Sequence, residues 1–272
     1  MGWLILTLVG MVAGTFGSLL GLGGGIILVP ALFYLSGSIP GIPEITPQLA
    51  IGTSLMLIII TSLASSISYA KQKLIDFSSA WLFFAGSAPG AIIGAWLSKY
   101  FDKDSFTLYY GIFMLFMLFL LSYRPRLRGK KEKQWETTKT YTDANGQVHT
   151  YGYSKPYAIC LALAVGILSS VFGIGGGALL VPFLLVLFRF PPHVAAATSM
   201  FVILLSSSVG SVTHVVLGHV AWGAVIATAP GAWIGGKVGS QLSRKLSGQW
   251  LERILKVVLL LIAIRMLWQG LK

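Results

Sequence analysis

Charged side chains are scarce in this sequence. Of its 272 residues only 10% are Asp, Glu, Lys or Arg, and only 8 are acidic, whereas 55% are hydrophobic. A soluble domain of this length needs more charge to cover its surface. The shortage argues against an ordinary water-soluble protein, and we expect an integral membrane protein with lipid as a partner.

Cysteines, catalytic sets and nucleotide motifs are also missing. The single cysteine, Cys160, excludes a disulfide framework or a cysteine metal cluster, and we expect it to be an ordinary buried residue. The sequence contains no G-x-x-x-x-G-K-[ST] phosphate loop, no H-E-x-x-H zinc motif and no acid pair. We therefore predict no enzyme activity, no metal and no cofactor.

Long apolar runs fill most of the chain. Most of them can cross the ~30 Å hydrocarbon core at ~1.5 Å per helical residue, and they lack the strict alternation of a transmembrane barrel. We predict an all-α polytopic protein with eight to ten membrane segments, in which the first run is a permanent helix and not a removed signal. The runs are 2–20, 48–70, 77–97, 105–123, 157–172, 194–218, 220–236 and 255–268.

The net charge of +12 is concentrated in one segment between apolar runs. Such an excess of Lys and Arg is typical of a cytoplasmic loop of a protein in the cytoplasmic membrane, and it does not require a nucleic-acid partner. Counting crossings from this loop places the other basic turns, at 71–73, 189 and 244–245, inside the cell as well. The basic residues of the loop are Arg124, Arg126, Arg128, Lys130, Lys131, Lys133 and Lys139.

Two glycine-rich stretches repeat one another. GLGGGIILVPAL at 21–32 and GIGGGALLVPFL at 173–184 are identical at 8 of 12 positions, at an offset of 152 residues. We divide the chain into a first transmembrane repeat, 1–123, a basic cytoplasmic linker, 124–155, and a second repeat, 156–272. Further matches are Pro47, Thr53 and Ser54 with Pro192, Thr198 and Ser199 (offset 145), and Pro89-Gly90-Ala91 with Pro230-Gly231-Ala232 (offset 141).

The two halves are expected to have opposite orientations. The eleven-residue segments 26–36 and 178–188 either span the membrane or re-enter from one face. In both cases each half contains an odd number of crossings, so the two halves form an inverted repeat. In the linker, TYTDANGQVHTYGY at 140–153 alternates around Asn145-Gly146 and predicts a β-hairpin. The alternative is a disordered linker.

The repeated glycines predict broken helices. A break at membrane depth leaves unpaired backbone groups, which survive only where they face protein or a water-filled cavity. The helix that starts after each break presents N–H groups and a positive dipole end, which favour an anion. The candidate substrate-binding glycines are Gly23, Gly24, Gly25, Gly175, Gly176 and Gly177.

Hydroxyl side chains at repeat-related positions could complete this site without burying a charge. The candidates are Thr53, Ser54, Thr198 and Ser199, although bonding to backbone carbonyls is an equally good interpretation. Hydroxyls further along the same helices, such as Thr61 and Ser206, are expected to hold helices together. No carboxylate lies in mid-membrane, so proton or anion coupling would fall to His193, His214 or Gln48.

Other glycines recur every four residues and suit close helix packing. They are Gly86, Gly90 and Gly94 in the first half, and Gly231, Gly235 and Gly239 in the second.

These residues resemble a known family. The two copies of G-[LI]-G-G-G-x-[IL]-L-V-P, the downstream Thr-Ser pairs and the Pro-Gly-Ala segments are similar to the sulfite exporter TauE/SafE family, also called the 4-toluene sulfonate uptake permease family. The resemblance covers nearly the whole chain except the linker. It implies a multi-spanning permease for a small sulfur-containing anion, such as sulfite, sulfoacetate or another organosulfonate.

The residues and the resemblance together lead to the hypothesis of a secondary transporter that works by alternating access. A passive anion channel and an anion-sensing membrane partner subunit remain as alternatives, and a homodimer is left open. The exact anion, the direction of transport and the coupling ion do not follow from the sequence.

Overall fold

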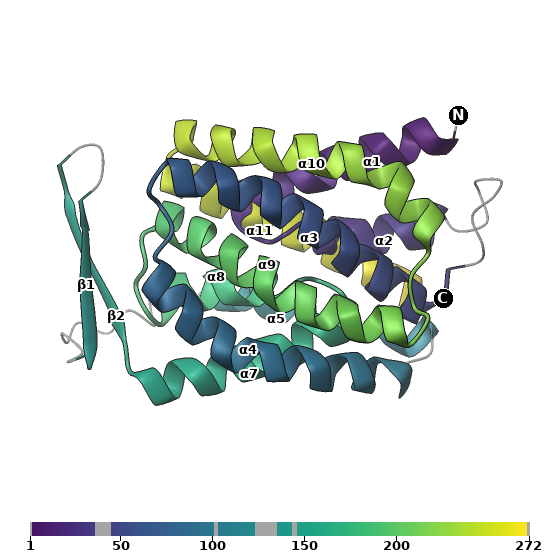
Figure 1. The fold of residues 1–272 in the computed structure, drawn as a ribbon, viewed down its shortest axis with the longest axis horizontal. Coiled ribbons are helices and arrows are strands. Elements are labelled where there is room, and N and C mark those ends of the chain that lie inside the picture. The colour runs from purple at the N-terminus through teal and green to yellow at the C-terminus, as the bar shows by residue number, and fades with distance from the viewer. Residues whose placement is uncertain (1, 36–44, 101–102, 123–134, 143–145, 271–272) are drawn as a thin grey trace.

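The computed structural model describes residues 2–35, 45–100, 103–122, 135–142 and 146–270, and these are mostly α-helical (Figure 1). The first half contains α1 (Gly2–Leu20), α2 (Gly25–Leu35), α3 (Pro47–Lys71), α4 (Phe77–Leu97), a 3-10 turn η1 (Ser98–Tyr100) and α5 (Lys103–Ser122). The second half contains α7 (Lys155–Phe172), α8 (Gly177–Val186), α9 (Pro192–Val216), α10 (Trp222–Lys245) and α11 (Gly248–Gly270).

The helices begin and end where local chemistry favours it. Pro47 and Pro192 open α3 and α9, where a missing N–H costs nothing, and the Thr46 hydroxyl accepts a hydrogen bond from the Leu49 N–H. Asp76 caps α4 by accepting from the Ser79 N–H. Within the described residues, five helices, α1, α3, α4, α7 and α9, are long and apolar enough to span a membrane.

The helices lie side by side along the long axis of the molecule (Figure 1). Both chain ends lie at one end of this bundle, which we call the terminal end; the hairpin lies at the other, the hairpin end. The turns between α3 and α4, α8 and α9, and α10 and α11 are also at the hairpin end (Figure 1). Three of the basic residues predicted to share one membrane face, Lys71, Arg189 and Arg244, lie in or next to these turns and are therefore at the hairpin end.

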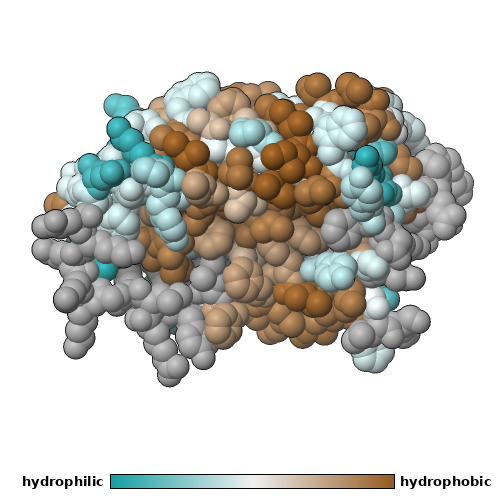
Figure 2. Space-filling view, turned by 90° about the horizontal axis from the view of Figure 1, so that it is seen from below, coloured by the Kyte–Doolittle hydropathy of each residue, from teal (hydrophilic) through white to brown (hydrophobic). Residues whose placement is uncertain are grey.

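A hydrophobic band crosses the middle of the bundle on the face seen in Figure 2. Figure 2 shows apolar residues across the centre of one face, with hydrophilic residues toward its two ends. Leu4, Ile226 and Leu261 are each more than 60% exposed. An apolar surface of this extent is unfavourable in water and suits lipid.

Exposed aromatic side chains border the band. Trp81 and Trp96 lie near opposite ends of α4, and Trp250 and Trp268 near opposite ends of α11. Their spacings of 15 and 18 residues correspond to roughly 22 and 27 Å along a helix. Tryptophans at such a separation are typical of the two interfaces of a ~30 Å hydrocarbon core.

Cys160 does not have the predicted environment. Its thiol is exposed on α7, so the prediction of burial is wrong. A small apolar side chain can point outward where the surrounding solvent is lipid, and the usual association of cysteine with the core then fails.

The linker contains a two-stranded antiparallel hairpin. β1 (Thr137–Thr142) pairs with β2 (Val148–Tyr153), with Thr142 opposite Val148. Gly146 has φ of +79°, while the remainder of the predicted turn, including Asn145, and residues 124–134 lie outside the described residues. The hairpin packs on the bundle: the Gly152 N–H donates to the Phe188 carbonyl at 3.1 Å, and the Tyr151 and Phe190 rings are 4.2 Å apart.

Two pairs of helices pack at very short range. α1 lies against α10 and α4 against α7. A Cβ atom on Gly90 would overlap the Leu163 carbonyl, and one on Gly231 would overlap the Thr7 carbonyl. The packing role predicted for these glycines is confirmed by such contacts.

We expect Gly231→Ala to destabilise the protein by about 1–3 kcal/mol, because the new methyl group forces α10 away from α1. Gly223→Ala is the matched control on the same helix, where a Cβ would meet no atom within 4 Å. Thermal unfolding of the two purified variants in detergent tests this. Equal midpoints for both variants would contradict the proposed contact.

Candidate functional site

Both repeated glycine stretches are breaks between helices. The first lies between α1 and α2, and the second between α7 and α8. Three glycines in each adopt φ values between +66° and +94°, a region that side chains with a Cβ rarely enter. These are Gly21, Gly23 and Gly24 in the first break, and Gly173, Gly175 and Gly176 in the second.

The two breaks meet in the buried centre of the bundle. A Cβ on Gly25 would lie 2.5 Å from the Gly173 carbonyl oxygen. Gly23 and Gly175 face the same two side chains, Ile58 of α3 and Ile203 of α9. Segments 152 residues apart in sequence therefore share one contact region.

Two serines brace the breaks reciprocally. The Ser54 hydroxyl of α3 donates to the Gly173 carbonyl in the second break at 2.7 Å, and the Ser199 hydroxyl of α9 donates to the Gly21 carbonyl in the first break at 2.7 Å. Both side chains are fully buried. Each half thus satisfies a backbone oxygen of the other half's break, where lipid could not.

The two threonines are held just as reciprocally. The Thr53 hydroxyl accepts from the Ala221 N–H at 2.9 Å, before α10, and the Thr198 hydroxyl accepts from the Asp76 N–H at 3.0 Å, before α4. Each oxygen is engaged as an acceptor, and its O–H remains a donor.

Backbone donors at the breaks are partly occupied. The Gly23 N–H donates to the Gly17 carbonyl at 3.2 Å. The third and fourth N–H groups of α2 donate to the Gly24 carbonyl, and those of α8 donate to the Gly176 carbonyl. The first two N–H groups of each helix have no partner inside their own helix, and they lie at the positive end of its dipole. The start of α2, at Gly25, lies against the second break.

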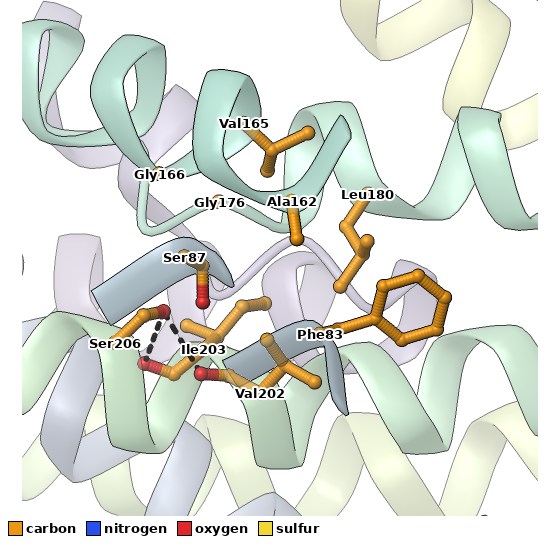
Figure 3. A pocket seen from close by; sticks show the side chains of 10 residues that line it. All are labelled: Phe83, Ser87, Ala162, Val165, Gly166, Gly176, Leu180, Val202, Ile203 and Ser206. Carbon is orange, nitrogen blue, oxygen red and sulfur yellow. Dashed lines mark hydrogen bonds between the residues drawn. The ribbon is translucent and has the colours of Figure 1, made fainter. Parts of the chain in front are cut away.

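A small cavity lies against the second break. Its walls include Gly176, Ile203, Ser87 of α4 and Ser206 of α9 (Figure 3). Its space for water-sized molecules is about 10 Å³, roughly the room that one water needs. In the state described, the cavity is therefore too small for a polyatomic ion.

The predicted coupling residues are not at the breaks. The Gln48 amide donates to the Ser98 carbonyl at 3.2 Å, and His193 lies in the first turn of α9 at the hairpin end. His214 is fully buried in α9, with its ring 5.5 Å from that of His219. Among the described residues neither ring nitrogen of His214 has a hydrogen-bond partner.

A charged network that the sequence analysis missed holds the hairpin to the bundle. The Lys139 ammonium lies 2.6 and 2.9 Å from the two Asp76 carboxylate oxygens, and the Tyr151 hydroxyl donates to the same carboxylate at 3.2 Å. Burial alone would raise the pKa of Asp76, but the hydrogen bonds from Lys139 and Ser79 outweigh it and lower that pKa. The position of Asp76 before an apolar run indicates a helix cap, but nothing local in the sequence pairs it with Lys139, which lies 63 residues away.

The structure has the architecture of a multi-pass membrane protein, because a hydrophobic band crosses a helical bundle and two helix breaks meet at its centre. Broken helices of this kind are frequent in transporters. The family model described as sulfite exporter TauE/SafE matches residues 6–266, so the chain belongs to this family of membrane transporters.

Named relatives agree with this assignment. The chain is 45% identical over 270 residues to the probable membrane transporter protein YunE of Bacillus subtilis (strain 168), a match that covers 99% of both chains. It is 27% identical over 254 residues to a probable membrane transporter protein of Xylella fastidiosa (strain Temecula1), covering 93% of this chain and 90% of the relative. It is 25% identical over 265 residues to the probable membrane transporter protein MJ0441 of Methanocaldococcus jannaschii, a match that covers 94% of this chain and 91% of the relative. No solved structure matches the chain.

Removing one bracing hydroxyl should weaken the fold. Ser199→Ala leaves the buried Gly21 carbonyl without its donor from α9, and we expect a loss of about 1–3 kcal/mol. Ser208→Ala is the matched control, because the Ser208 hydroxyl is partly buried and donates to Leu204 in its own helix. Unfolding midpoints measured side by side check this, and a control as damaging as Ser199→Ala would refute the bracing role.

The hairpin should detach when its ion pair is lost. Lys139→Met leaves the Asp76 carboxylate without its ammonium partner, so we expect the β2 amides to exchange hydrogen about tenfold faster or more. Lys155→Met, at an exposed lysine at the start of α7 with no ion pair among the described residues, should leave exchange unchanged.

The same network sets a pH dependence. Because the folded-state pKa of Asp76 is lowered, its contribution is complete above the unfolded carboxyl pKa of about 3.9 and disappears as the pH falls through the folded-state value. Contact of the hairpin with the bundle should therefore be constant from about pH 5 to 8 and weaken only below pH ~4. Hydrogen exchange of the β2 amides, measured against pH, tests this. Loss of their protection from exchange near pH 6 would contradict this account.

Proposed function

We propose that this protein is a secondary transporter that moves a small sulfur-containing anion, such as sulfite, sulfoacetate or another organosulfonate, across the cytoplasmic membrane by alternating access. The contact between the two glycine breaks at the buried centre carries the proposal. Family membership supports the transporter class. The anion class comes from the family description and from the chemistry of the site.

The alternating-access part of the proposal includes an inverted repeat of the two halves. It is supported by the direction of two helices, since α1 starts at the terminal end of the bundle and α7 at the hairpin end (Figure 1). The reciprocal bonds of Ser54 with Gly173 and of Ser199 with Gly21 relate the halves as a two-fold axis would. Two structurally equivalent halves can exchange conformations and so open the centre to each face in turn.

Neutral donors suit an anion that must also leave. The helix starts at Gly25 and Gly177 offer N–H groups, and Thr53 and Thr198 offer free O–H groups on either side of the breaks. Hydrogen bonds from neutral groups attract an oxyanion without the strong hold of a buried Lys or Arg. For coupling, we propose His214, because it is a fully buried titratable group whose ring lies beside that of His219.

Labelled sulfite uptake by proteoliposomes, with and without an imposed pH gradient and with sulfoacetate, thiosulfate and sulfate as competitors, tests the function. We expect saturable uptake that depends on the gradient. A channel would be favoured if uptake did not saturate, did not depend on the gradient and were far faster than that of a carrier. Binding without uptake would favour a sensor subunit, in which the docked hairpin is the output.

Gly24→Leu and Gly176→Leu should abolish this uptake while leaving membrane insertion intact. Both glycines have positive φ. A leucine at Gly24 would overlap the Ala13 carbonyl of α1, and one at Gly176 would point toward Ser169 and Val165 of α7, beside the cavity. Gly146→Leu, at an exposed hairpin glycine whose Cβ would meet no atom within 4 Å, controls for the strain of positive φ. Wild-type uptake by both break variants would refute the site.

A further inference from the structure

Two serines face the cavity at the second glycine break, and neither belongs to the site as the sequence predicts it. Figure 3 shows Ser87 and Ser206 at one end of the cavity, with Phe83 and Leu180 at the other. The Ser206 hydroxyl donates to the Val202 carbonyl of its own helix at 2.8 Å, and the Ser87 hydroxyl reaches the Phe84 carbonyl only at 3.4 Å. Such bonds within one helix can be exchanged for a ligand by rotation of χ1.

The first half contains the counterpart of this hydroxyl pair. The offset of 145 residues relates Ser206 to Thr61, and the offset of 141 relates Ser87 to Thr228. Thr61 and Thr228 are both fully buried, and their hydroxyls have no hydrogen-bond partner among the described residues. Unpaired buried hydroxyls are unfavourable, and other serines of α3, α7, α9 and α10 in the described chain share this state. Thr61 and Thr228 differ from these serines because they correspond to the two serines that face the cavity.

The two halves differ in the space beside their breaks. A Cβ on Gly176 would come no closer than 3.4 Å to another atom, the Ser169 hydroxyl oxygen, which is ordinary contact. A Cβ on the equivalent Gly24 would lie 2.8 Å from the Ala13 carbonyl oxygen, which is an overlap. The second half is therefore open where the first half is closed.

We propose that the two hydroxyl pairs, Ser87 with Ser206 and Thr61 with Thr228, bind the oxyanion in turn, one pair in each conformation of the transport cycle. This inference rests on the proposed function and adds four binding residues to it. In the state described, the serine pair faces a cavity and the threonine pair is shut off from any ligand. When the first half opens, the threonine hydroxyls gain the acceptor that they now lack, and the sulfonate or sulfite oxygens supply it.

The threonine pair gives a test that separates binding from structure. Thr61→Val and Thr228→Val keep the side-chain shape and remove only the hydroxyl. A structural hydroxyl would leave a less stable protein, but an unpaired one can be lost with no change or a gain in stability. We expect unfolding midpoints equal to or above wild type, together with labelled sulfite uptake reduced about tenfold or more.

The serine pair is tested by the substrate concentration at half-maximal uptake. Ser87→Ala and Ser206→Ala should each raise the KM for sulfite about tenfold, because one donor to the anion is lost. Ser87→Val should also fill the cavity and stop uptake. Ser208→Ala, which removes a hydroxyl of α9 that bonds within its own helix, should keep the wild-type KM.

Wild-type KM and rate in all four hydroxyl-deletion variants would overturn this inference and leave the proposed function standing. Reduced uptake in Thr61→Val and Thr228→Val that tracks reduced unfolding midpoints would also overturn it, since it would make the threonines structural. Absence of uptake by the wild-type protein would count against the proposed function itself, and sulfite binding measured on the same sample would show whether the sites still hold the anion.

Discussion

Pairing of the backbone at the two broken helices is the constraint on which this structure depends. An interrupted helix in a membrane exposes carbonyl and amide groups that lipid cannot satisfy. Here each break turns toward the other half of the molecule, and Ser54 and Ser199 donate across to the two breaks. The close packing of α1 on α10 and of α4 on α7 keeps the breaks at a depth where they meet.

The two ends of the bundle are fastened differently. At both ends a backbone N–H donates to a buried threonine, from Asp76 to Thr198 and from Ala221 to Thr53. At the hairpin end Asp76 also binds Lys139, so an ion pair connects the hairpin to the α3–α4 turn. Near the terminal end the corresponding turn lies close to His214 and His219, which have no such carboxylate among the contacts of the described residues. The two halves, although similar in sequence, are therefore held by different interactions at the two ends of the bundle.

Much of the fold could be predicted from the sequence because membrane proteins carry strong one-dimensional signals. Apolar length predicts the long helices, and the alternation in 140–153 predicts a hairpin, whose strands are Thr137–Thr142 and Val148–Tyr153. Glycines repeated at an offset of 152 residues indicate the breaks. The direction in which a side chain points is not encoded so directly, and Cys160 shows it, since in lipid an apolar residue is as stable outside the bundle as inside.

The site could be predicted only as a set of residue types. The sequence suggests that Thr53 and Ser54 act together, but one accepts from Ala221 and the other donates to Gly173, partners more than a hundred residues away. The cavity serines are hidden in the sequence because hydroxyls are common in these helices and only packing distinguishes them. The shared contact of Ile58 and Ile203 with both breaks ties the two halves together. A substitution at either isoleucine changes the packing of both breaks at once, so neither half can vary independently at this contact.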